Sequence, residues 1–118
     1  MMVEGNPGSA VRAIAYEDLE CGDCAVYRRM LDQQLIPKYD KQVAFEHREF
    51  PLPKHKWARQ ASIAARHFDR IDPKLGVAFR KYVMQNQPEI TAENFSAKVH
   101  AFAQTNGADG PQATAALN

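Results

Sequence analysis

The sequence predicts an α/β fold in which a strand–helix–strand unit comes first and a set of helices follows. The apolar run Val11–Tyr16 precedes an amphipathic helical pattern, and a second strand-like run covers residues 43–50. From Trp57 onward, apolar residues keep helical spacing almost to the end of the chain. The first three elements predict a right-handed βαβ unit with two parallel strands. A chain of 118 residues is long enough for a single core.

The composition is that of an ordinary globular protein. Hydrophobic residues make up 45% of the chain and charged residues 25%. The 15 Lys and Arg nearly balance the 14 Asp and Glu, so the net charge of +1 argues against nucleic-acid or polybasic membrane binding. No apolar run approaches the length of a membrane span. The start lacks the regions of a signal peptide, so we expect a cytoplasmic protein, or a periplasmic or extracytoplasmic one if a leader is removed.

The first strand and helix follow from local patterns. Residues 3–9 are rich in Gly, Pro, Asn and Ser and predict an irregular lead-in. The run Val11–Tyr16 is β-branched and aromatic, as in a strand. The next helix has Arg28 and Asp32 on a side expected to face water, and Pro37 should kink or end it. Its apolar stripe consists of Val26, Met30, Leu31 and Leu35.

The second strand, residues 43–50, stops at Pro51-Leu52-Pro53. Three helices are expected after it, the first ending near Asp72-Pro73 and the second running from Leu75 to about Asn86. Thr91 is expected to cap the third helix and Gly107 to stop it. Trp57, Phe79 and Tyr82 have the spacing of core residues. Residues 107–118 are polar and rich in Gly and Ala, which predicts a loose segment.

The two cysteines of the chain, Cys21 and Cys24, lie between the first strand and the helix. A pair at this spacing and place is typical of dithiol chemistry in a thioredoxin-like βαβ unit. Residues i and i+3 of a first helical turn are close enough for a disulfide. The unpaired N–H groups and the dipole at the helix start stabilise a thiolate there. We therefore expect Cys21 to be the attacking thiol and Cys24 the resolving thiol.

Two other readings of the cysteine pair stay open, a structural disulfide and half of a metal site. A zinc site needs four ligands, and the sequence has no second cysteine pair. In a zinc or iron–sulfur site shared between two chains, the second chain would supply the second cysteine pair, and the metal would link the chains as a dimer. The histidines are scattered, with no two at metal-ligand spacing on one helix: His47, His55, His67 and His100.

Three polar residues near the cysteines need an interpretation. Asp18 is a candidate proton relay to Cys24, because exchange requires a thiolate at each step. The competing interpretation of Asp18 is a solvated residue in the loop before a helix. For Glu20 we favour this second interpretation, a solvated loop residue. His55 is expected in an exposed turn.

Three stretches of the chain resemble the DsbA-like thiol–disulfide oxidoreductases, which have a thioredoxin fold with a helical domain inserted after the second strand. The most specific stretch is YEDLECGDC, where Tyr16, Asp18, Cys21 and Cys24 match the family pattern. FEHREFPL is similar to the family's second strand and its exit, and Trp57–Asn106 to the inserted helices. The resemblance implies a βαβ portion at residues 1–54, an inserted helical domain at 55–106 and a loose end at 107–118.

The chain departs from the family pattern in two respects. Gly22-Asp23 stands where strongly oxidising members carry Pro-His, and the aspartate opposes a second negative charge. We therefore expect a less oxidising couple. The family's C-terminal ββα half, with its cis-proline loop, has no counterpart after Gly107. Two parallel strands alone would leave both sheet edges unpaired. We therefore expect this chain to be the N-terminal portion of a larger oxidoreductase, or an oxidoreductase whose missing half is supplied in a swapped or tightly packed homo-oligomer.

The resemblance implies a thiol–disulfide oxidoreductase that exchanges disulfides with protein substrates through Cys21 and Cys24. Its partners would be protein thiols or disulfides and a redox partner that recycles it, with no metal or organic cofactor. The direction of exchange is not fixed by the sequence. The alternative is a non-catalytic thioredoxin-like binding module that keeps a structural disulfide.

Overall fold

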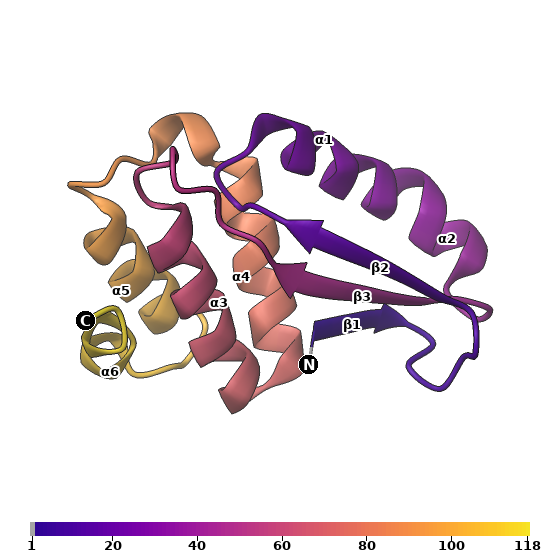
Figure 1. Cartoon of the computed structure of the whole chain (residues 1–118). Coiled ribbons are helices and arrows are strands. Elements are labelled where there is room, and N and C mark those ends of the chain that lie inside the picture. The colour runs from indigo at the N-terminus through magenta and orange to yellow at the C-terminus, as the bar shows by residue number, and fades with distance from the viewer. Residues whose placement is uncertain (1) are drawn as a thin grey trace.

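The protein is built on a three-stranded sheet with helices along it and at one end (Figure 1). The computed structural model describes residues 2–118. The strands are β1 (Met2–Gly5), β2 (Arg12–Glu17) and β3 (Ala44–Glu49), in the order β1-β3-β2. Strand β2 runs parallel to β3, with Ile14 opposite Glu46. The parallel pair predicted from the sequence is therefore confirmed.

The irregular lead-in expected at residues 3–9 is wrong for its first half, because β1 forms there. Strand β1 pairs antiparallel with β3, from Met2 opposite His47 to Gly5 opposite Ala44. Gly5 has φ +80°, and a Cβ on it would lie 2.4 Å from the carbonyl oxygen of Val43, so only glycine fits. One of the two edges expected to be bare is thus covered. Within residues 2–118, the outer edge of β2 pairs with no strand.

A single long helical rod crosses from β2 to β3. Helix α1 (Gly22–Met30) continues through a π-helical segment, η1 (Leu31–Leu35), into the short α2 (Ile36–Tyr39). Pro37 lies in the first turn of α2, inside the continuous rod, and has no N–H to donate to the preceding helical turn. The rod ends two residues later, close to the predicted end.

The three predicted helices of the second part are present as α3 (Ala58–Ile71), α4 (Pro73–Gln85) and α5 (Phe95–Thr105). A short 3₁₀ helix, η2 (Gln87–Glu89), follows α4. The cap predicted at Thr91 is displaced: Thr91 bonds Asn94 in a turn, and α5 begins after it.

The expectation of a loose segment at residues 107–118 is wrong. Helix α6 (Gly110–Ala115) forms there, and its Asp109 cap accepts a hydrogen bond from the N–H of Gln112 at 2.9 Å. Ala113 and Leu117 are buried against the other helices. The short helix α6 therefore covers one side of the core, a role that the composition of this segment did not reveal.

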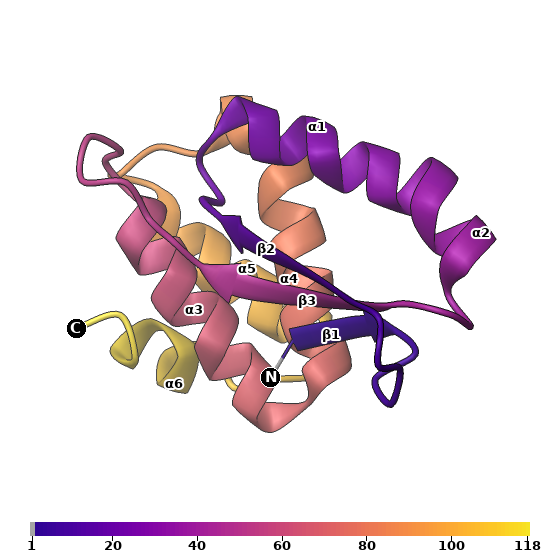
Figure 2. The same ribbon diagram turned by 45° about the vertical axis from the view of Figure 1, so that its right-hand side comes forward.

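The core lies mainly among the helices. Phe68, Phe79 and Phe102 pack with ring centroids 5.0–5.1 Å apart, and Trp57 stacks on Phe95 at 5.8 Å. Figures 1 and 2 show α3–α6 gathered at one end of the sheet, while α1 and α2 run along the strands. No helix within residues 2–118 is long and apolar enough to cross a membrane.

Candidate active site

Both cysteines lie where β2 leads into α1, at the place that the sequence predicts. Cys21 is the N-cap residue of α1, in an extended conformation, and Cys24 is in the first helical turn. Both side chains are partly exposed free thiols. The carbonyl of Cys21 accepts the N–H of Ala25 at 3.2 Å, so the N–H groups between them have no helical partner. This end of the helix therefore favours a negative charge on sulfur.

Cys24 is partly buried and packs against the hydrophobic core. Burial raises the pKa of the Cys24 thiol, and the nearby Cys21 sulfur and Glu17 carboxylate add to the rise. The backbone N–H of Asp18 opposes it by donating a hydrogen bond to the Cys24 sulfur at 3.5 Å. A raised pKa keeps Cys24 protonated until a partner needs it, as a resolving thiol requires.

Asp18 fixes the turn between β2 and α1. One carboxylate oxygen accepts the N–H of Glu20 at 2.8 Å. The other accepts the N–H of Leu52 at 2.8 Å and faces Nδ1 of His55 at 2.6 Å. Asp18 is only 4% exposed, so these three bonds satisfy a buried charge. Its role as a proton relay stays a prediction.

Two expectations about this region are wrong. Glu20 is not simply solvated: its carboxylate accepts the N–H of Trp57 at 2.8 Å. His55 does not stand free in an exposed turn, since it bonds Asp18. Together Asp18 and Glu20 join the cysteine turn to the loop after β3. The partners are more than 30 residues apart in sequence, so local spacing held no signal for these contacts.

Gln87 supports the same turn from the helical part of the chain. Its side-chain amide donates to the carbonyls of Leu19 at 2.8 Å and Cys21 at 2.9 Å. Both acceptors lie in the connection from β2 to α1, so η2 holds the start of the helix in place. A glutamine in a short polar segment gave no sign of this role in the sequence.

A shallow hollow of about 250 Å³ opens beside Cys24. Tyr16, on one wall, is 61% exposed and meets Phe50 edge-on with ring centroids 6.4 Å apart. The hollow thus offers apolar surface next to the Cys24 sulfur. It is lined by Ala15, Tyr16, Glu17, Asp23, Cys24 and Tyr27.

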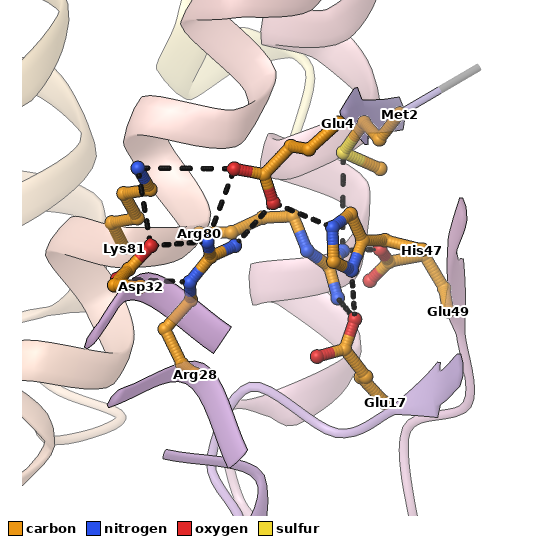
Figure 3. A network of polar contacts seen from close by, with 9 residues as sticks. All are labelled: Met2, Glu4, Glu17, Arg28, Asp32, His47, Glu49, Arg80 and Lys81. Carbon is orange, nitrogen blue, oxygen red and sulfur yellow. Dashed lines mark hydrogen bonds and ion pairs between the residues drawn. The ribbon is translucent and has the colours of Figure 1, made fainter. Parts of the chain in front are cut away.

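A buried network of charges lies beneath the site, between the sheet and helices α1 and α4 (Figure 3). Arg28 of α1 bonds both carboxylate oxygens of Glu4, at 2.6 and 3.0 Å. Arg80 of α4 bonds Glu17 at 2.9 Å and also contacts Glu49. Arg28 is 1% exposed, so the expectation that it faces water is wrong. Arg28 is buried because a carboxylate of the sheet, that of Glu4, receives its guanidinium.

His47 stands at the centre of this network (Figure 3). Its two ring nitrogens lie 2.7 Å from Glu17 and 2.7 Å from Glu4. Burial disfavours the charged ring, yet the hydrogen bonds to the two carboxylates raise the pKa of His47. Burial likewise disfavours the ionised form of Glu4, but His47 and Arg28 lower its pKa to about 2. Because ionised carboxylates only accept hydrogen bonds, both ring nitrogens donate, and His47 is an imidazolium that bridges the two carboxylates.

Among residues 2–118, no group of three or more His, Cys, Asp or Glu side chains is arranged to hold a metal ion.

Comparison with known proteins gives this site its family context. The family described as thioredoxin matches residues 1–118, the whole chain. The chain belongs to the thioredoxin family. Among curated proteins, none matches the sequence.

Several solved structures share this fold. The α-DsbA1 structure from Wolbachia pipientis matches with a TM-score of 0.81 at 18% identity, over 99% of this chain and 59% of its own. The thiol–disulfide exchange protein α-DsbA2 from the same organism gives 0.78 at 20% identity, over 98% and 58%. Oxidised BdbD from Bacillus subtilis gives 0.76 at 18% identity, over 98% and 64%.

These matches confirm the DsbA-like fold that the sequence predicts, a thioredoxin-type sheet with a helical insertion. This thioredoxin-family chain spans about 58–59% of the length of the Wolbachia structures. Within residues 2–118 no strand follows β3, in agreement with the absence of the C-terminal ββα half.

Proposed function

We propose that this chain is a thiol–disulfide oxidoreductase that exchanges disulfides with protein substrates through Cys21 and Cys24. The observation that carries the proposal is the pair's position: Cys21 caps α1 and Cys24 lies in its first turn, directly after a sheet strand. The resemblance of the fold to a thiol–disulfide exchange protein supports it.

The two thiols have different roles, attack by Cys21 and resolution by Cys24. Cys21, at the helix start, attacks one sulfur of a substrate disulfide and forms a mixed disulfide, while the other substrate sulfur leaves as a thiolate and takes up a proton. Cys24 then loses its proton and attacks the Cys21 sulfur. The Cys21–Cys24 disulfide forms, the second substrate thiolate leaves, and two electrons have passed to the substrate. The oxidising direction is the reverse, with a redox partner to recycle the chain.

Insulin-disulfide reduction by dithiothreitol tests the proposal. The wild-type chain should accelerate it, and Cys21→Ser should reduce the rate to that without protein, because the attacking sulfur is gone. Lys54→Ala serves as the matched control, since Lys54 is exposed in a loop near the site. Equal turnover by wild type and Cys21→Ser would remove catalysis and leave the alternative of a binding module with a structural disulfide.

A further inference from the structure

We propose that His55 is a positioning residue for Cys24, acting through Asp18, and that it accelerates the release step of the exchange. This inference rests on the proposed function, because release requires Cys24 to attack a mixed disulfide at Cys21.

The Asp18 carboxylate is held from three sides. Nδ1 of His55 lies 2.6 Å from one oxygen, which also accepts the N–H of Leu52. The second oxygen is bonded to the N–H of Glu20. Because an ionised carboxylate only accepts hydrogen bonds, Nδ1 of His55 carries the hydrogen. The His55 side chain is 20% exposed and that of Asp18 is 4% exposed, so the imidazole is the more exposed partner of a nearly buried carboxylate.

Asp18 carries this restraint to the sulfur through its own backbone. Its N–H donates to the Cys24 sulfur at 3.5 Å. A donor on sulfur favours the thiolate over the thiol, and only the thiolate attacks. Burial acts in the opposite direction and raises the pKa of Cys24. Loss of the well-placed donor would therefore leave less thiolate and slow the attack by Cys24. Fixing the Asp18 side chain keeps that N–H aimed at the sulfur.

The step that His55 assists is balanced within the chain and its substrate. The proton of Cys24 passes to solvent, and the thiolate attacks the Cys21 sulfur of the mixed disulfide. The Cys21–Cys24 bond forms as the bond between Cys21 and the substrate sulfur breaks. The departing substrate thiolate takes up a proton from water. His55 and Asp18 exchange no electrons and form no covalent bond.

A single-turnover experiment separates attack from release. The reduced chain is mixed with glutathione disulfide, the reaction is quenched with acid at intervals, and mass spectrometry follows the glutathione adduct. His55→Ala should slow decay of the adduct about tenfold, the effect of one charge-assisted hydrogen bond. Its formation at Cys21 should change less than about twofold. His55→Asn keeps an N–H donor at the position of Nδ1 and should restore most of the decay rate, while Lys54→Ala should match wild type.

A double-mutant cycle tests whether His55 acts through Asp18. His55→Ala should have little further effect in an Asp18→Ala background, because the path to the sulfur is already cut. Independent effects of the two substitutions, or no rescue by His55→Asn, would overturn the assignment. If Asp18→Ala does not fold, the comparison of His55→Ala with His55→Asn decides alone. A wild type that forms no glutathione adduct would refute the proposed function as well, whereas normal exchange by both wild type and His55→Ala would contradict only the role of His55.

Discussion

Replacing His47 by leucine should be among the most damaging single changes to this fold. The imidazolium bridges two carboxylates, Glu4 and Glu17, each 2.7 Å away, whose side chains are 13% and 2% exposed. Leucine fills similar space but leaves both carboxylates short of a partner in a buried region. Breaking a buried ion pair on one side costs about 3–5 kcal/mol. Arg28 and Arg80 still neutralise part of the charge, so we expect a loss of about 3 kcal/mol.

Urea unfolding followed by circular dichroism at about pH 6 measures this loss, with the imidazolium and both carboxylates charged. His67→Leu is the matched control, because the buried Nε2 of His67 has no hydrogen-bond partner to lose. The control should change the unfolding free energy by less than about 1 kcal/mol. Glu17→Gln should recover part of the loss in the His47→Leu background. A loss below about 1 kcal/mol for His47→Leu would refute the bridging imidazolium.

Three further changes test other parts of the site. The lowered pKa of Glu4 contributes stability that is present above pH 4.5 and is lost as the pH falls towards about 2. Glu4→Gln should therefore flatten the pH dependence of the unfolding free energy in that range. An unchanged pH dependence between about pH 4.5 and 2 would contradict this. Gln87→Ala should cost about 1–2 kcal/mol in urea unfolding and slow insulin reduction, because two carbonyls of the cysteine turn lose their donor; the exposed Gln104→Ala should do neither. Cys24→Ser should accumulate a stable mixed disulfide at Cys21 with glutathione, and rapid loss of that adduct would contradict the assignment of Cys24 as the resolving thiol.

What the sequence predicts well is local. The helix start beside Cys21 follows from a strand pattern, a Cys-x-x-Cys and a helical stripe that are continuous in the chain. Helices α3 and α4 follow from apolar periodicity and from the Asp72-Pro73 break. Each of these features is decided within a few residues, so no knowledge of the rest of the fold is needed.

What the sequence hides depends on distant partners. Strand β1 forms because Met2–Gly5 meets the edge of β3, more than 35 residues away, although its own residues favour a loop. Arg28 lies on the polar side of its helix and is buried because carboxylates on the sheet receive it. His55 gains its role only when the loop after β3 folds onto Asp18. Propensity and periodicity do not encode such pairings.

Equilibration of the wild-type chain in glutathione redox buffers tests the central claim most directly. Thiols are trapped with an alkylating agent at each buffer potential, and mass spectrometry counts them. We predict one two-electron transition in which Cys21 and Cys24 of the same chain are lost together as an intramolecular disulfide, and which is absent in Cys21→Ser. Cysteines that stay reduced across the series, or that oxidise only between chains, would contradict the account of a redox pair at the start of α1.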